Sequence, residues 1–581
     1  MNLKIMLAAL AGTMPLLASG SAMMNPPVAI APHMAQALLT QLSGQRTMLG
    51  LGLDHGYVLD SQQPGSTGSA VLRFKHTYKG LPVFGSETVL VVGHNGKLLG
   101  QSVADRRARL GVPAANRGIA LGVKAVIGPQ EAIATAIRSV ATGGVAMAPP
   151  RAELLVYPIV RTERVPSAAG KAEEDLNALD LADVIDSYEL AYHVRTRMRI
   201  GQQPLFHDTI VSANDARIID QWSMLQTATA TGSGKSQYNG VVPLSTSQDG
   251  KLFKMLDTSR GINGQFGAMA ITNADHGSEA GAVYTASANE WGDGLQYKEG
   301  GSTTDANGQT AAVNAMWGLM NTYDMLKNVL GWHSLDGQNT ASYIAAHVNT
   351  AYDNAYYNDS CKCMFIGDGS SFNSLGAIDV VGHEMGHGVT ASTSNLLYFG
   401  ESGGLNESSS DINGEAVEAY ARAGGVGDQL ANAGNDWVMG KEISKSATPL
   451  RWLYKPSKDG SSPDAWNSSL KRLDVHYSSG PNNRMFYFLA QGSKAEKDSD
   501  YYSKYLVKAP AAMSGIGTDK AYRIWFKAAS TKFTAVTNYK EARAKMIEAA
   551  QELYGMGSRE ALAVQRAYAA INVGADVDEK D

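Results

Sequence analysis

Two histidines four positions apart, with a glutamate directly after the first, lie in the segment from Val380 to His387. Side chains at this spacing share one face of a helix, about 6 Å apart at Cβ, so the imidazoles of His383 and His387 can bind one Zn²⁺. Glu384 then projects toward a water at the metal and can remove its proton. Two hydrogen-bonded helix histidines without a metal are the alternative that this motif alone leaves open.

A second polar segment places carboxylates on one helix face, because Glu407, Asp411 and Glu418 recur with helical spacing. A catalytic zinc site needs a third protein ligand and one position open to water, and Glu407 is the candidate. Asp411, one turn later, can accept the N–H of a zinc-binding histidine and fix its tautomer. A solvated acidic face is the alternative, and the small and apolar residues among these acids disfavour it.

Helices must position these motifs, and the helical repeat of apolar residues dominates the chain after Ile378. Helices are predicted at residues 379–393, 407–423, 480–491, 519–531 and 539–554. Residues 237–376 are instead rich in Gly, Asn, Asp and Tyr, with short strand-like runs and one helical stretch at 311–330. We therefore expect a β-rich half followed by a helical half.

Strand-like and helix-like stretches alternate between residue 23 and about residue 230, which predicts a small β-rich unit and then a small α+β unit. The small and polar residues from Thr227 to Ser236 predict a flexible, protease-accessible linker. The first 22 residues combine Lys4, an apolar stretch and small terminal residues, which is typical of a secretory signal. No later run is long enough to span a membrane, so no membrane anchor is expected.

Composition excludes several classes of protein. With 581 residues, 44% of them hydrophobic and 18% charged, the chain has ample material for a packed core and several domains. Its 50 Lys and Arg against 55 Asp and Glu give no broad surface for nucleic-acid phosphates, so no nucleic-acid partner is expected. Only two cysteines are present, Cys361 and Cys363, and export favours a disulfide between them over two free thiols.

These motifs and the spacing between them resemble the thermolysin-like neutral metalloproteases, most closely the vibriolysin and pseudolysin branch. Upstream, Tyr78–Gly85 resembles the propeptide signature of such zymogens, and residues 120–225 resemble their second, inhibitory propeptide unit. The resemblance implies an α+β fold, in which a two-lobed catalytic domain follows a two-unit propeptide. The implied segments are a signal peptide (1–22), two propeptide units (23–115 and 116–230), a β-rich catalytic lobe (231–378) and a helical catalytic lobe (379–581).

The resemblance also assigns roles at the active site. It implies one catalytic Zn²⁺ with three protein ligands, His383, His387 and Glu407, and a general base, Glu384. His476 lies in a segment that resembles the one supplying a transition-state stabiliser, and Tyr398 matches the tyrosine that shares this task. Asp474, two residues before His476, is expected to orient it.

A substrate cleft can be outlined from the same resemblance. Asn354 and Ala355 match the edge-strand residues that hydrogen-bond the substrate backbone. Leu450 and Arg451 resemble the pair in which Arg binds a peptide carbonyl and Leu lines the primary pocket. Val380 completes that pocket together with Phe372 and Leu375. An apolar pocket predicts cleavage before bulky hydrophobic residues, which is a P1′ preference.

A calcium site is expected beside the zinc site. Four acids match the ligands of the single-calcium type in this family, and the carbonyl of Val438 adds a fifth oxygen; the acids are Asp379, Glu415, Glu418 and Asp436. The paired-calcium type has further acids where this chain has Val438 and Lys441. One ion rather than two is therefore expected at this site, and at least one calcium ion in the protein. Salt bridges among these acids and neighbouring cations are the alternative.

The leading hypothesis is therefore a bacterial protease, secreted through a signal peptide as a monomer and made as a self-processing zymogen. It would hydrolyse peptide bonds of protein and peptide substrates with zinc, a metal-activated water and Glu384, while its own propeptide acts as intramolecular chaperone and inhibitor. A binding protein that keeps the fold without catalysis is one alternative. A zinc aminopeptidase is another, but the nearest segment to its anchor motif, Gly267–Ile271, lacks the required Glu.

Overall fold

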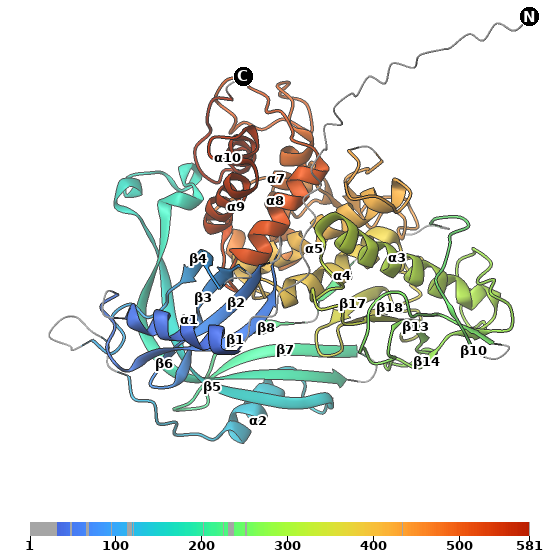
Figure 1. Cartoon of the computed structure of the whole chain (residues 1–581), viewed down its shortest axis with the longest axis horizontal. Helices are drawn as coiled ribbons and strands as arrows, with labels where there is room; N and C mark the ends of the chain where they lie inside the picture. The colour runs from blue at the N-terminus through green and yellow to red at the C-terminus, as the bar shows by residue number, and fades with distance from the viewer. Residues whose placement is uncertain are drawn as a thin grey trace, which may run out of the picture.

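A computed structural model describes residues 32–46, 49–65, 69–93, 96–112, 119, 121–200, 203–224, 226–229, 238–249, 252–432 and 434–579 (Figure 1). The predicted signal peptide, residues 1–22, lies outside these ranges, and so does most of the predicted linker. Among the described residues, no helix is both long and apolar enough to cross a membrane.

The N-terminal part of the chain builds one large antiparallel-rich sheet with two helices. Its strands run in the order β1-β2-β3-β5-β6-β7-β8, and β4 pairs with β3. The two predicted propeptide units share this sheet: Val83 and Val156 pair in parallel between β3 and β5, and the Tyr188 hydroxyl donates to the carbonyl of Ala108 at 2.8 Å. The elements are α1 (Pro32–Gly44), β1 (His55–Pro64), β2 (Ala70–Tyr78), β3 (Leu81–Val92), β4 (Leu98–Ala104), α2 (Pro129–Val140), β5 (Val145–Arg164), β6 (Leu181–Ile200), β7 (Gln203–Ser212) and β8 (Ile218–Ser223).

A second sheet forms the β-rich half of the following part, in the order β12-β13-β16-β18-β17-β9, with β14 beside β13. Short strands β10, β11 and β15 make a separate sheet, and α3 packs on β13 and β16. These elements are β10 (Ser247–Asp249), β11 (Leu252–Lys254), β12 (Leu256–Asp257), β13 (Met269–Asn273), β14 (Ala282–Val283), β15 (Thr285–Ala286), α3 (Ala306–Leu330), β16 (Tyr343–Ala346), β17 (Asn354–Asn358) and β18 (Cys363–Ile366).

Strand β9 (Gln226–Thr229) corrects the expectation of a flexible linker from Thr227 onward. It adds antiparallel to the outer edge of β17, with Thr229 opposite Asn354 and Gln226 opposite Tyr357. An edge strand presents unpaired N–H and C=O groups, and these override the weak local preferences of small polar residues. Residues 230–236 of the predicted linker lie outside the described residues.

The C-terminal half is helical, as the periodicity predicts. Each of the five predicted helices is present; four begin and end within a residue or two of the prediction, and α5 begins seven residues earlier. The glycines and serines of its first turns have weak helix propensity, so periodicity did not reveal them. The elements are α4 (Ile378–Ser392), α5 (Gly400–Arg422), β19 (Val438–Met439), β20 (Arg451–Trp452), α6 (Val475–Ser478), α7 (Gly480–Gln491), α8 (Thr518–Thr531), α9 (Tyr539–Tyr554) and α10 (Arg559–Ala570).

Helices α4 and α5 lie unusually close together, because glycines face each other between them. A Cβ on Gly382 would lie 2.9 Å from the Cα of Gly414. A Cβ on Gly414 would in turn lie 2.7 Å from the carbonyl oxygen of Asp379. Only glycine permits this separation, and it brings the side chains on the facing sides of the two helices into contact.

The N-terminal sheet contacts the rest of the chain at several places along its length. In Figure 1 the long β5–β6 hairpin rises beside the C-terminal helices, while the other end of the same sheet lies under β17 and β18. One contact comes from the β1–β4 region, one from the hairpin tip and one from the far end of β6. They are Arg73 Nη1 to the Phe533 carbonyl (3.1 Å), Lys471 Nζ to Thr162 Oγ1 (2.8 Å) and Arg197 Nη2 to Asp359 Oδ2 (3.2 Å).

We expect Gly414→Ala to destabilise the helix pair, because the added methyl group collides with backbone rather than with a movable side chain. Overpacking of this kind costs roughly 1–3 kcal/mol. The measurement is the melting temperature of the metal-free protein, together with its zinc content after reloading. Gly122→Ala is the matched control, since no atom lies within 4 Å of a Cβ placed there; equal melting temperatures for both variants would contradict the packing argument.

Candidate metal centre and active site

The two motif histidines lie on α4 with their rings facing the same point. His383 Nδ1 donates to Asp411 Oδ1 at 2.7 Å, and His387 Nδ1 donates to Asn406 Oδ1 at 2.9 Å. A carboxylate can only accept, and the Asn406 amide is oriented because its Nδ2 donates to the Leu396 carbonyl at 2.8 Å. Both histidines therefore carry their proton on Nδ1 and present a lone pair at Nε2.

These Nε2 atoms lie 3.2 Å apart in the buried interior, with Glu407 of α5 beside them. Glu407 Oε1 is 3.3 Å from His387 Nε2, and Glu407 Oε2 is 3.6 Å from His383 Nε2. Ligands of a tetrahedral zinc at about 2.05 Å are spaced about 3.3 Å apart, which these distances match. Two facing lone pairs and a buried carboxylate repel each other unless a cation lies between them, so the residues fit a zinc ion.

Electrostatics keep His383 and Glu407 in their metal-binding forms. Burial lowers the pKa of His383, so the imidazole stays neutral. Burial alone would raise the pKa of Glu407, but the histidines around it hold that pKa well below its ordinary value. Among the described residues, the group of potential ligand atoms close enough to share a metal is formed by His383, His387 and Glu384, whose ligand atoms lie within 4.8 Å of one another.

Asp411 is the hub of a buried network under the histidines. Besides His383, it accepts from Arg451 Nε at 2.8 Å, Arg451 Nη2 at 2.5 Å and Asn483 Nδ2 at 2.7 Å. Burial would raise the pKa of Asp411, but Arg451 and His383 outweigh it and lower the pKa to about 2. The sequence argument placed Asp411 here and missed Asn406 and Asn483; Asn406 directly precedes Glu407, which is the signal that was available.

Glu384 is fully buried beside the histidines and next to β17. Its Oε2 accepts the backbone N–H of Tyr357, in β17, at 3.1 Å. This hydrogen bond fixes the carboxylate between α4 and the strand that carries Asn354 and Ala355. A base held at this position faces both the metal site and any chain lying along β17.

Tyr398 and His476 reach the metal site at Glu407. The Tyr398 hydroxyl donates to Glu407 and lies 3.3 Å from His476 Nε2. Asp474 caps α6 and accepts from His476 Nδ1 at 2.6 Å, as expected of the residue that orients this ring. Burial would lower the pKa of His476, but Glu407 and Asp474 outweigh it and raise the pKa to about 9, so the ring is a proton donor at neutral pH.

The predicted pocket residues belong to the main apolar core. Val380 is 2% exposed on α4, and Phe372 and Leu375 are fully buried in the same apolar cluster. Leu450 packs against this cluster, next to Arg451. Arg451 is bonded to Asp411 through two of its nitrogens, so its position relative to the metal ligands is fixed.

The predicted calcium residues line a cavity of about 500 Å³ between α4, α5 and β19. Three of the four predicted acids and Val438 lie on its wall, namely Asp379, Glu418 and Asp436. Burial raises the pKa of Asp379 to about 7 and that of Glu418 to about 8. Glu415, also fully buried, has its pKa raised well above the ordinary value by burial and by Glu418.

The described cationic side chains compensate only part of the negative charge of these four carboxylates. Arg422 pairs with Glu418 at 3.0 Å and Lys441 with Asp436 at 2.8 Å. Glu415 Oε1 and Glu418 Oε2 are buried without a hydrogen-bond donor among the described residues. Oxygen-only ligands with a surplus of negative charge fit a hard cation such as Ca²⁺. Lys441 occupies one side of the cavity, in keeping with one ion.

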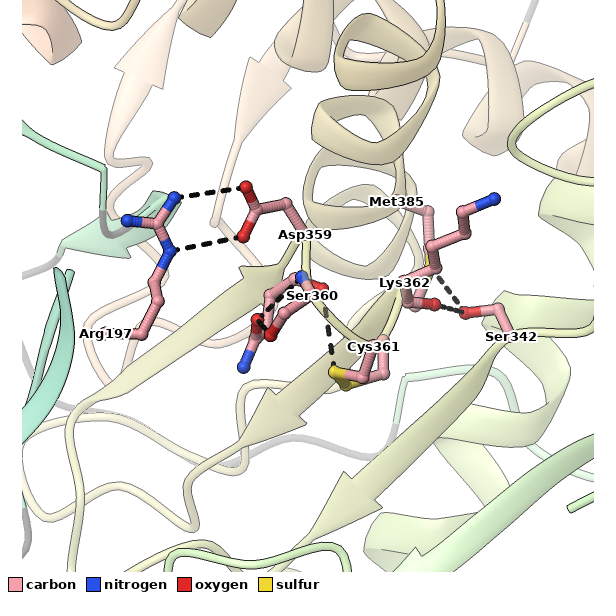
Figure 2. Close-up of a disulfide and its surroundings, with 9 residues drawn as sticks. Arg197, Ser342, Asp359, Ser360, Cys361, Lys362 and Met385 are labelled. Atoms are coloured by element: carbon pink, nitrogen blue, oxygen red, sulfur yellow. Dashed lines mark hydrogen bonds and ion pairs between the residues drawn. A yellow bond between two sulfur atoms is a disulfide. The ribbon is translucent and has the colours of Figure 1, made fainter. Parts of the chain in front are cut away.

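The two cysteines form a disulfide in the turn between β17 and β18 (Figure 2). The same turn carries Asp359, which Arg197 of β6 approaches with two nitrogens, and Lys362, whose carbonyl accepts from Ser342. The disulfide therefore lies at the β17–β18 turn, next to the residue that the N-terminal sheet contacts.

Comparisons with known sequences identify the family. Residues 231–391 match the profile described as the thermolysin metallopeptidase catalytic domain, and residues 394–573 match its alpha-helical domain. Residues 55–100 match the fungalysin/thermolysin propeptide motif. The chain belongs to the thermolysin metallopeptidase family. It is a zinc metalloendopeptidase that carries its propeptide, and the expected α+β fold with its β-rich and helical parts is confirmed.

Several curated relatives align along most of this chain. A transglutaminase-activating metalloprotease from Streptomyces mobaraensis is 33% identical over 558 residues, covering 94% of this chain and 65% of that protein. A bacillolysin from Brevibacillus brevis is 29% identical and covers 90% of this chain and 85% of its own length. A thermolysin from Alicyclobacillus acidocaldarius is 29% identical, with 89% and 85% covered.

We expect Asp411→Asn to weaken zinc binding roughly 10–100-fold, because the histidine loses its anionic partner and Arg451 its counter-ion. Competition with a chromogenic chelator measures the zinc affinity of the processed protein. Asp500→Asn, at an exposed acid far from the histidines, is the control for the loss of one charge. Unchanged zinc affinity in Asp411→Asn would show that this hydrogen bond does not tune the site.

Proposed function

We propose that this protein is a secreted endopeptidase made as a self-processing zymogen, which cleaves peptide bonds before bulky hydrophobic residues. One observation carries the proposal: the strand beside Glu384 and the histidines already pairs, through its outer edge, with a strand of the chain's own propeptide. A polypeptide in extended conformation is therefore the ligand that this cleft accommodates.

When bound, the zinc ion supplies Lewis acidity that activates a water molecule and polarises the substrate carbonyl. Glu384 is the general base: held by the Tyr357 N–H, it takes a proton from the attacking water and passes it to the leaving amine. His476 and Tyr398 donate hydrogen bonds to the negative charge that develops on the carbonyl oxygen. Asp474 keeps the His476 ring oriented and protonated on both nitrogens.

Substrate orientation follows from the two walls of the cleft. The backbone of β17 hydrogen-bonds the substrate chain, and Asn354 and Ala355 lie where Thr229 and Ala228 pair in the zymogen. Arg451, locked on Asp411, faces the peptide carbonyl after the cleaved bond. The apolar side chains of Val380 and Leu450, with Phe372 and Leu375, favour a bulky hydrophobic side chain at P1′.

The propeptide is proposed as inhibitor and as intramolecular chaperone. As inhibitor, β9 blocks β17 by the same strand addition that a substrate uses. As chaperone, the N-terminal sheet contacts both the β-rich half, at Asp359, and the helical half, at Lys471 and Phe533. Cleavage in the region of residue 230 then breaks the covalent link between the propeptide and the catalytic domain. The proposed signal peptide at residues 1–22 directs the zymogen out of the cell as a monomer, as part of the same proposal.

One Ca²⁺ is proposed at the cavity between α4 and α5, with Asp379, Glu415, Glu418 and Asp436 and the Val438 carbonyl as ligands. The surplus of buried carboxylate oxygens at this site supports it. Because Asp379 lies one helical turn before His383, an ion here also restrains the helix that carries the zinc ligands.

Glu384→Ala is expected to keep one zinc per chain and to lose at least about a thousandfold of its casein-degrading activity, because the base alone is removed. It should also remain unprocessed unless wild-type enzyme is added. Zinc analysis, casein hydrolysis with and without 1,10-phenanthroline, and intact mass test this. Full activity in a metal-loaded, processed Glu384→Ala protein would refute the assignment of the base.

Calcium is expected to raise the melting temperature of the chelator-treated protein by several degrees, since an ion at 100 times its Kd stabilises by about 2.7 kcal/mol. Glu415→Gln should remove most of this gain. Glu442→Gln, in an acid that lines the same cavity but is not a proposed ligand, should keep it. The calcium proposal fails if wild-type protein melts at one temperature with and without calcium.

A further inference from the structure

The last strand of the propeptide sheet, β8, carries an aromatic side chain that contacts the catalytic domain. Trp222, near the end of β8, stacks on Phe399 with ring centroids 4.8 Å apart and an interplanar angle of 30°. Trp222 is 5% exposed, and its Nε1 donates to the sulfur of Met224 at 3.2 Å. Trp222 is thus held on the catalytic domain by stacking and apolar contact.

The surface under Trp222 belongs to the catalytic domain and is apolar. We call it the Phe399 patch; it consists of Leu397, Phe399 and Val475. These side chains pack in one cluster with Trp222 and Tyr398, together with apolar residues of the propeptide. The contacts that Trp222 makes with this patch are aromatic and apolar, so a chain that replaces the propeptide needs a large apolar or aromatic group to restore them.

The Phe399 patch borders the catalytic groups directly. Phe399 follows Tyr398, whose hydroxyl reaches both Glu407 and His476. Val475 precedes His476 on α6. A side chain seated on the patch therefore lies beside the cleft, on the side where Tyr398 and His476 stand.

One short stretch of chain joins the Phe399 patch to the cleft strand. Four residues after Trp222, Gln226 begins β9 and pairs with Tyr357 of β17. The propeptide thus occupies the patch with a tryptophan and the substrate strand with β9 in a single continuous run, in the order in which a bound substrate would fill them.

We propose that in the processed protease the Phe399 patch is a distal substrate-binding subsite, which accepts an aromatic or large apolar side chain. The residue it takes lies four positions before the substrate residue that pairs with Tyr357, on the N-terminal side of the cleaved bond. The inference rests on the proposed endopeptidase function. It predicts that long substrates with such a residue upstream are cleaved faster than short ones, through a lower KM.

The first test is the cleavage profile of the processed wild-type enzyme on a proteome-derived peptide mixture, read by mass spectrometry. Aromatic and large apolar residues should be enriched at one position several residues upstream of the cleaved bonds, besides any preference next to them. The processed Phe399→Ala enzyme should lose this upstream enrichment and keep the rest of the profile. No upstream enrichment in the wild type, or the same enrichment in Phe399→Ala, would overturn the proposal.

In the second test the main comparison varies the peptide and leaves the enzyme unchanged. A synthetic peptide with the sequence of residues 220–229 is compared, as an inhibitor of the processed wild-type enzyme, with the same peptide carrying Trp222→Ala. The intact peptide should bind roughly tenfold more tightly, and the two peptides should bind equally to Phe399→Ala. Equal inhibition of the wild type by both peptides would contradict the subsite.

Two further measurements, of activity on a short substrate and on casein, distinguish a failure of this inference from a failure of the proposed function. A dipeptide-length substrate, too short to reach the Phe399 patch, should be hydrolysed by wild type and Phe399→Ala at rates within about twofold. If the wild-type protein cuts neither casein nor this short substrate, the proposed function fails. If it cuts both, while the tryptophan matters for the inhibitory peptide but no upstream preference is seen on substrates, the patch serves only to hold the propeptide and the subsite proposal is wrong.

Discussion

The close approach of α4 and α5 is the constraint on which the site depends. Glycine at 382 and 414 lets the two backbones meet, and this sets the His383, His387 and Glu407 ligand atoms 3.2–3.6 Å apart. Asp379 lies on α4 one turn before His383, and the same close approach of the helices brings it near Glu415 and Glu418 of α5. Both proposed metal sites therefore lie between these helices, and in both the cation offsets a repulsion that close packing creates.

Buried charge is organised around Asp411 rather than around the metal alone. Its carboxylate joins His383, Arg451 and Asn483, so a zinc ligand and the arginine proposed to bind substrate are fixed by one group. On the other side, Glu407 joins Tyr398 and, through it, His476. Three of the groups proposed to touch the substrate, Arg451, Tyr398 and His476, are thus connected to a metal ligand by one or two hydrogen bonds, which restrains the reacting geometry.

The propeptide uses the site in the way proposed for a substrate. Its sheet reaches the β-rich half through Arg197 and the helical half through the β5–β6 hairpin, while Trp222 and β9 run along the cleft. No single contact is large, but several weak contacts on one rigid sheet act together, because binding at one orders the others. Cutting the chain after β9 would leave these contacts in place, so release requires that they be lost together.

The sequence alone determined the chemistry and most of the helices. His383, Glu384 and His387 sit within one turn of a single helix, and Glu407 with Asp411 within one turn of another, so local periodicity was enough to pair their functions. Helices α4, α7, α8 and α9 followed from the same periodicity. The early turns of α5, the role of Asn406 and the strand character of Gln226–Thr229 did not, because glycine-rich or small polar segments have no local preference strong enough to read.

Only the tertiary structure decided what these segments do. Gln226–Thr229 becomes a strand because β17 offers an open edge, and Trp222 contacts Phe399 because the propeptide sheet carries it there. The tautomers of both histidines, and thus the fit to zinc, depend on Asn406 and Asp411 from another helix. Chemistry carried by neighbours in sequence can be predicted from the sequence, whereas contacts between separate segments, from 19 residues apart for His387 and Asn406 to 177 for Trp222 and Phe399, depend on how the whole chain packs.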